Sequence, residues 1–204
     1  MVRNGVRALL ESAGVEVVGD AHDGREAVRL AAALRPDVVI LDVAMPGMNG
    51  IEAARVIREA DPRVGIIMLS MHGDRQYIAE AVKAGASGYV LKDAAFSELH
   101  TAVTAVMAGR VHFSPEVSRT AVDDYVRRVR NEVPPTSLDL LSSRERQVLQ
   151  LIAESKTSSE IGKALHISIH TVDTHRRKIM EKLDLHNVVD LVKFAIRHGL
   201  ATVD

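Results

Sequence analysis

In the first half of the chain, short apolar runs alternate with longer stretches in which apolar residues recur every three or four positions. Runs that are apolar at successive positions are typical of strands buried on both faces of a parallel sheet, and the longer spacing is typical of amphipathic helices. The alternation predicts an α/β domain built on an open, doubly wound parallel sheet. The predicted strands are Val15–Val18, Val38–Leu41, Ile66–Leu69 and Tyr89–Leu91, and the predicted helices are Gly24–Leu34, Gly50–Ala60, Asp74–Ala84 and Ala95–Ala108.

The pattern changes after Gly109. Ser114–Pro115 is a good helix start, because Ser caps a helix and Pro suits its first position, and Pro134–Pro135 ends that helix. We therefore expect a first domain over residues 1–110, a helical linker over 111–138 and a second domain over 139–204.

The second domain has helical spacing only. Its third predicted helix follows the second after a short link, which is the helix-turn-helix arrangement. We expect an all-α domain of four helices, at Ser143–Ala153, Ser158–Leu165, Ile169–Leu183 and Asn187–His198.

Composition narrows the class of protein. Of the 204 residues, 47% are hydrophobic but only 3% are aromatic, so the cores must be aliphatic. There is no Cys, hence no disulfide and no thiolate metal site, which fits a reducing compartment. No apolar run approaches the roughly 20 residues that cross a bilayer, and no secretory signal opens the chain. We expect a cytoplasmic protein without membrane contact, and the net charge of −1 means that any nucleic-acid binding depends on local clusters of cations.

Three polar side chains follow neighbouring strands of the predicted sheet. Asp42, Ser70 and Lys92 each stand where a strand ends, and the carboxyl ends of parallel strands are where such folds place their chemistry. Taken singly, each is as well explained by a turn cap or a solvated strand end. Together, a carboxylate, a hydroxyl and an ammonium at one edge favour a functional site.

The segments DVVILDVAMPGMNGIEAARVIRE, IIMLSMHGD and AGASGYVLKDA resemble successive blocks of a response-regulator receiver domain of the NarL/FixJ family. The resemblance implies a flavodoxin-like fold in which Asp42 accepts a phosphoryl group from a sensor histidine kinase. It also implies that Ser70 turns toward the phosphoryl oxygens, that Tyr89 moves with Ser70, and that Lys92 pairs with the phosphoryl group. The chemistry suits these residue types, because a carboxylate nucleophile gives an acyl phosphate and a cation offsets the transferred charge.

Receivers of this kind begin with a strand that ends in two acidic residues, which hold Mg²⁺. Here Val2, Val6, Leu9 and Leu10 instead open the chain on an amphipathic helix, so the first strand is missing. Three explanations of the missing strand are open. The sequence is truncated or starts at a wrong codon, the domain is rearranged, or the strand order of the family is abandoned. Of the metal ligands that the resemblance implies, Asp42 and the Ala44 carbonyl are left, and a hard cation prefers more oxygens. We expect weak or absent Mg²⁺ binding and phosphorylation.

The second domain, with the core SSEIGKALHISIHTVDTHRRKIMEKL, resembles the LuxR/NarL-type DNA-binding domain almost end to end. The resemblance makes Ile169–Leu183 the recognition helix, which carries a local excess of cations. Residues facing the major groove read bases, whereas flanking cations and hydroxyls hold phosphates. We expect base contacts from Asp173, Thr174 and Arg177, with Asp173 either meeting a cytosine amino group or orienting Arg177, and phosphate contacts from Thr157, Ser158, Thr171, Arg176, Lys178 and Lys182.

The whole pattern predicts a two-domain regulator that binds double-stranded DNA under the control of aspartyl phosphorylation. DNA-binding domains of this type act as dimers on paired half-sites, and the resemblance places the dimer contact at Val188, Leu191 and Val192. By analogy, the unphosphorylated receiver would cover the recognition helix. One alternative is an orphan regulator that binds DNA without phosphoryl control, because the acidic pair is absent. An aspartyl phosphohydrolase is disfavoured because it needs a second acid where Ala44 stands, so we expect no enzyme.

Overall fold

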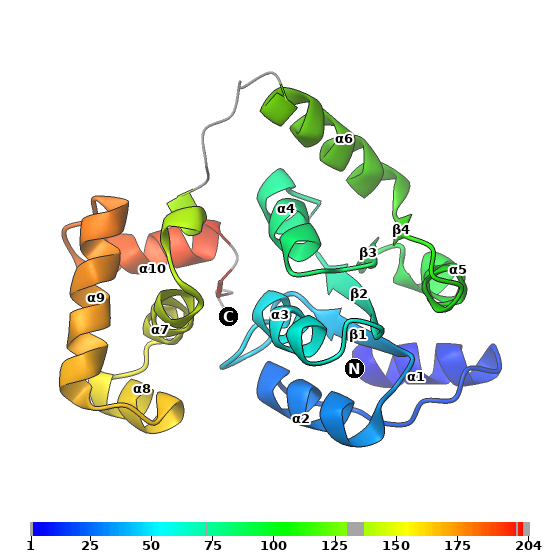
Figure 1. The fold of residues 1–204 in the computed structure, drawn as a ribbon, viewed down its shortest axis with the longest axis horizontal. Helices are drawn as coiled ribbons and strands as arrows, with labels where there is room; N and C mark the ends of the chain where they lie inside the picture. The colour runs from blue at the N-terminus through cyan, green and yellow to red at the C-terminus, as the bar shows by residue number, and fades with distance from the viewer. Residues whose placement is uncertain (1, 72, 130–136, 199, 202–204) are drawn as a thin grey trace.

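The computed structural model describes residues 2–71, 73–129, 137–198 and 200–201. Strands and helices alternate in the first half, and helices alone make up the second (Figure 1). The strands are β1 (Val38–Asp42), β2 (Gly65–Ser70), β3 (Gly88–Leu91) and β4 (His112–Phe113). The helices of the first half are α1 (Val2–Ser12), α2 (Gly24–Leu34), α3 (Gly50–Ala60), α4 (Arg75–Lys83), α5 (Ala95–Met107) and α6 (Pro115–Val129). The second half has the short 3-10 helix Ser137–Leu140 and the helices α7 (Ser143–Ala153), α8 (Ser158–Leu165), α9 (Ile169–Leu183) and α10 (Val188–Arg197).

The sheet is parallel and has the order β1-β2-β3-β4. All six residues of β2 and all four of β3 are buried, as expected for strands covered by helices on both faces. Ile66 and Met68 face one layer of core, and Ile67 and Leu69 face the other. The α/β architecture with a parallel sheet is therefore confirmed.

Two strand assignments differ from the sequence analysis. Val15–Val18 is not a strand, because β1, the edge strand of the described sheet, pairs with β2 alone and no described strand lies on its other side. Main-chain carbonyls of this segment and of the residues after it instead accept hydrogen bonds from side chains of α1: Arg7 donates to the Val17 carbonyl at 3.4 Å, and Arg3 donates to the Ala21 carbonyl at 2.9 Å. In contrast, β4 was not foreseen, because two residues are too short to show a pattern.

Helix starts follow from capping residues. The side chains of Asp23 and Asn49 accept the third main-chain N–H of α2 and α3, and Ser142 and Thr157 form full capping boxes with Glu145 and Glu160 at α7 and α8. These caps fix where the loops at the site end and the helices begin.

The second half has its own core, formed by apolar residues of α7, α8, α9 and α10, including the fully buried Val148, Leu149 and Ile179. The linker helix α6 packs against α4 through its buried Val117. Pro134–Pro135, predicted to end this helix, lies outside the described residues. Within the described part of the chain, no helix is both long enough and apolar enough to cross a bilayer.

Candidate functional site

The carboxyl edge of the sheet brings Asp42 and Lys92 together. Asp42 is the last residue of β1, and Lys92 follows β3, where its main-chain N–H donates to the Ser70 carbonyl at 2.8 Å. The Lys92 ammonium lies 2.5 Å from Oδ2 of Asp42, and Oδ1 of Asp42 accepts the Ala44 N–H at 3.0 Å. The Asp42 side chain is 34% exposed, so a carboxylate with a paired cation remains open to solvent.

Helix α3 starts close behind this carboxylate. The Gly50 N–H donates to the Val43 carbonyl at 3.1 Å, and a Cβ at Gly50 would lie 2.1 Å from the main-chain oxygen of Asp42. Only glycine allows so close an approach. The β1–α3 loop is therefore held tightly between Asp42 and the first turn of α3.

Ser70 and Tyr89 lie side by side at the same edge. Ser70 ends β2 and is 3% exposed, and Tyr89 in β3 is fully buried. Burial raises the pKa of the Tyr89 phenol to about 12, and a hydrogen bond with Ser70 opposes the rise. The structure thus brings all four residues of the predicted phosphoacceptor site to one end of the sheet.

Receiver domains use Mg²⁺ for phosphorylation, so the ligand atoms near Asp42 decide whether this chain can hold the ion. Among the residues that the structure describes, no group of three His, Cys, Asp or Glu side chains lies close enough to hold a metal. Both oxygens of Asp42 already have a cation or an N–H as partner. The described side chains around Asp42 therefore do not form a magnesium site.

The helix-turn-helix forms as predicted, with α8 and α9 joined by a tight turn. His166 adopts the left-handed conformation, with φ of 53°, and ends α8, and Ser168 caps α9 by accepting the Thr171 N–H. A Cβ at Gly162 would meet the Ile167 carbonyl oxygen at 2.8 Å, so this close turn needs glycine. Val172 and Ile179 bury the inner face of α9, which turns Asp173 and Arg177 outward.

The other residues predicted to touch DNA fall into two groups. Lys178 is exposed, and Thr171, Thr174 and Arg176 are half-buried on the same helix. Thr157 caps α8. Ser158 and Lys182, in contrast, bind protein groups, because the Ser158 hydroxyl donates to Asp173 at 3.0 Å and the Lys182 ammonium lies 2.6 Å from Glu145. Asp173 thus accepts a hydrogen bond from Ser158, a partner that was not expected from the sequence, which suggested a cytosine amino group or Arg177.

Helix α10 exposes only part of its predicted dimer surface. Val188 is 37% exposed and Val192 is half-buried, but Leu191 is fully buried in the core of its own domain. Leu191 is therefore a core residue in this structure, because the apolar face of α10 packs against α7. The neighbouring Val189 is 60% exposed.

The first domain does not cover the recognition helix. Its contacts with the second domain run from the β1–α3 loop and α4 to α7, and α9 lies on the opposite side of the second domain (Figure 1). The expectation that the receiver masks α9 is wrong for this structure. The residues of α7 that make the contact were missed, because a polar face on a helix is usually a solvated one.

These observations define a class of protein: an α/β domain of the receiver type joined to a helix-turn-helix DNA-binding module. The family model of the response regulator receiver domain matches residues 1–104, and that of bacterial regulatory proteins of the luxR family matches residues 139–195.

Relatives match along the whole chain. The response regulator UvrY of Escherichia coli is 36% identical over 205 residues, which cover 100% of this chain and 93% of UvrY. Among solved structures, RcsB of Salmonella enterica serovar Typhimurium bound to a promoter with the phosphomimetic BeF3− has a TM-score of 0.62 at 28% identity, covering 99% of this chain and 94% of RcsB. Two RcsB dimers bound to two parallel DNAs give a TM-score of 0.54 at 28% identity, with 94% and 90% covered. The chain belongs to the NarL/FixJ family of two-component response regulators, with a receiver domain and a LuxR-type DNA-binding domain.

Proposed function

We propose that this regulator is switched at Asp42 by a sensor histidine kinase and reads duplex DNA with α9 as a homodimer. Its organisation is a receiver over residues 1–110, a linker over 111–138 and a DNA-binding domain over 139–204. The observation that carries the proposal is the Asp42–Lys92 pair, because a carboxylate at a strand end with an ammonium 2.5 Å away has the geometry for phosphoryl transfer.

The proposed transfer uses the chain's own groups as follows. A carboxylate oxygen of Asp42 attacks the phosphorus of a phosphohistidine, the N–P bond breaks as the new O–P bond forms, and the kinase imidazole keeps the electron pair and takes a proton. The Lys92 ammonium offsets the charge of the phosphoryl group. Ser70 then turns its hydroxyl toward the new oxygens, which removes its hydrogen bond to Tyr89 and changes the packing of that ring.

On the DNA side, Asp173, Thr174 and Arg177 face base edges and Arg176 and Lys178 hold phosphates. A carboxylate accepts hydrogen bonds only, so Asp173 pairs with an exocyclic amino group such as that of cytosine. The Ser158 hydroxyl holds Asp173 in one orientation, which favours this role over repulsion by phosphates. Promoter-bound and dimeric RcsB support the use of duplex DNA and a dimer, with Val188 and Val192 at the contact.

Salt-dependent binding separates the two kinds of contact. Fluorescence anisotropy of the full chain with duplex DNA should give an affinity that falls as salt rises, and Lys178→Ala should lower that slope by about 1. Asp173→Asn should leave the slope unchanged and alter the sequences selected from a random duplex pool. The exposed Lys163 on α8 offers a matched control, Lys163→Ala. If the affinity of the wild type for duplex DNA does not depend on salt, DNA binding by α9 is refuted.

Phosphorylation has its own test. The full chain is incubated with a small phosphodonor and Mg²⁺, and its intact mass is measured beside Asp42→Asn. A phosphoryl gain that the variant lacks, with tighter DNA binding, supports the switch and contradicts the weak phosphorylation expected from the missing acidic pair. DNA binding that is the same with and without the phosphodonor would instead identify an orphan regulator.

A further inference from the structure

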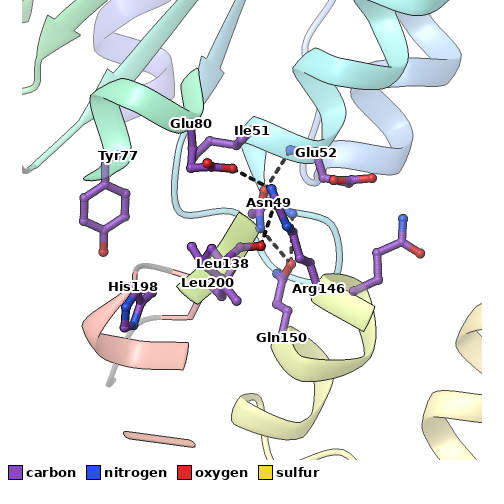
Figure 2. A pocket seen from close by; sticks show the side chains of 11 residues that line it. Asn49, Ile51, Glu52, Tyr77, Glu80, Leu138, Arg146, Gln150, His198 and Leu200 are labelled. Atoms are coloured by element: carbon purple, nitrogen blue, oxygen red, sulfur yellow. Dashed lines mark hydrogen bonds and ion pairs between the residues drawn. The ribbon is translucent and has the colours of Figure 1, made fainter. Parts of the chain in front are cut away.

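Helix α7 carries a polar stripe that faces the receiver domain. Arg146, Gln150 and Glu154 are spaced four residues apart, so they lie on one face of the helix, while Val148 and Leu149 point into the core of the DNA-binding domain. Figure 2 shows two residues of this stripe from close by, with Gln150 directed at Asn49 and Arg146 at Glu80.

Gln150 is 1% exposed, and both polar atoms of its amide are hydrogen-bonded. The Oε1 atom of Gln150 accepts the main-chain N–H and the side-chain N–H of Asn49, each at 3.2 Å. Its Nε2 donates to the Met45 carbonyl at 3.1 Å and to Glu154 at 2.9 Å, and Glu154 accepts the Gly47 N–H at 2.9 Å. Gln150 of α7 and Glu154, the residue that follows this helix, therefore bind three residues of the loop that leaves Asp42.

A second contact lies beside the first. Arg146 Nη1 is 2.5 Å from the carboxylate of Glu80 on α4, which is 3% exposed and also pairs with Lys83 at 3.1 Å. The guanidinium of Arg146 donates as well to the Leu138 carbonyl at 2.8 Å. A buried charge pair with further hydrogen bonds is costly to break from one side, because the remaining charge loses its partner.

We propose that the stripe Arg146–Gln150–Glu154 is a docking surface for this chain's own receiver, namely for the loop of residues 45–49 and for Glu80. The docked loop begins three residues after Asp42, so the state of Asp42 and the docking of α7 are coupled, and the coupling acts in both directions. Because α9 lies on the far side of the domain, the docked form leaves the DNA-reading face exposed. Docking thus controls where the DNA-binding domain is held and does not control access to α9.

The interdomain distance tests docking directly. The chain has no Cys, so Arg29→Cys and Lys163→Cys introduce two exposed sites, one in each domain, for a pair of nitroxide labels in the full-length protein. Electron–electron double resonance should give one narrow distance distribution. Gln150→Ala should broaden it, because it removes three hydrogen bonds to the receiver and so raises the open fraction about tenfold or more. Asn49→Asp should also broaden it, because it removes the Asn49 amide donor and places a carboxylate oxygen beside Oε1 of Gln150.

These variants are chosen to keep both domains folded. Asp is as good an N-cap as Asn, so Asn49→Asp preserves the cap of α3 while it removes the amide donor. The exposed Lys156, just past α7, offers the control Lys156→Ala, which should leave the distribution narrow. A broad wild-type distribution, or equal narrow distributions in all variants, would overturn the docking. A signal that appears only after mixing singly labelled chains would show docking between copies, which also overturns it. Asp42→Asn should change the docked fraction, and an unchanged fraction refutes the coupling.

The accessibility of α9 in the docked form rests on the proposed function and is tested separately. The unlabelled wild type, Gln150→Ala and Asn49→Asp are titrated against a fluorescein-labelled duplex of random sequence. The affinities should agree within about twofold, because docking and α9 are on distant surfaces. A gain of about tenfold or more in the variants would show that docking masks α9. If neither the wild type nor the variants bind the duplex, the proposed function and the accessibility of α9 are both refuted. The distance measurement still tests the docking on its own.

Discussion

Glu145 connects the first turn of α7 to the recognition helix, and its removal is the most informative single change in the DNA-binding domain. Its carboxylate accepts the Ser142 N–H at 2.8 Å, the Ser142 hydroxyl at 2.9 Å and the Lys182 ammonium at 2.6 Å. The Glu145 side chain is 4% exposed and that of Lys182 is 40% exposed. Glu145→Ala therefore leaves a half-satisfied helix start and an unpaired cation at the end of α9.

The expected loss of stability follows from these contacts. Loss of the capping box costs about 1 kcal/mol, and a hydrogen bond to a charged group contributes about 1.5 to 3 kcal/mol. The lower end applies to the Lys182 contact, because that ammonium is partly in water. The sum is about 2 to 3 kcal/mol, which lowers the melting temperature of a domain of this size by roughly 10 to 20 °C.

Differential scanning calorimetry of the full-length protein measures this loss. Glu160→Ala is the matched control, because Glu160 forms the same capping box with Thr157 at α8 but is exposed, and its described hydrogen bonds are to Thr157 and not to α9. The control should lower the melting temperature clearly less than Glu145→Ala. Equal shifts in the two variants would refute the role assigned to the Lys182 contact.

The same contact predicts a pH dependence. Burial raises the pKa of the Glu145 carboxyl, but the hydrogen bonds from Lys182 and Ser142 outweigh it and lower the pKa below 4.5. A carboxyl with a lowered pKa contributes stability that is present above its unfolded pKa and is lost as the pH falls through the folded value. The difference in stability between the wild type and Glu145→Gln should therefore shrink in acid.

Two further changes test the receiver domain. Gly50→Ala places a Cβ 2.1 Å from the main-chain oxygen of Asp42, so urea unfolding should show a loss of about 1 to 3 kcal/mol, whereas Gly73→Ala, with no contact under 3.7 Å, should be close to neutral. Burial raises the pKa of Glu52 above 4.5, although the Arg55 guanidinium opposes the rise. The contribution of Glu52 to the stability of the fold is therefore present below pH 4.5 and is lost as the pH rises through the raised pKa. The stability of the wild type relative to Glu52→Gln should thus fall as the pH rises from about 4.5 through the raised pKa of Glu52.

Patterns that depend on burial were predictable from the sequence. The strands β1, β2 and β3 are continuous apolar runs, and the ends of parallel strands meet at one edge, which is why Asp42, Ser70 and Lys92 were expected together. Their roles in phosphoryl transfer stay predictions. The segment Val15–Val18 was misassigned because apolar residues make a strand only where a neighbouring strand accepts their main-chain hydrogen bonds.

Contacts between polar surfaces were not predictable in the same way. The stripe of α7 has the composition of a solvated face, and only the arrangement in space shows that Gln150 is buried against the loop 45–49. Lys182 was likewise assigned to phosphates, because a cation on the recognition helix does not reveal in the sequence that Glu145 lies beside it. Helix α7 thus binds the receiver on one side and holds α9 on the other. A packed helix moves as a unit, so a change at the loop after Asp42 that releases Gln150 must move α9 together with α7 and alter its position relative to the receiver.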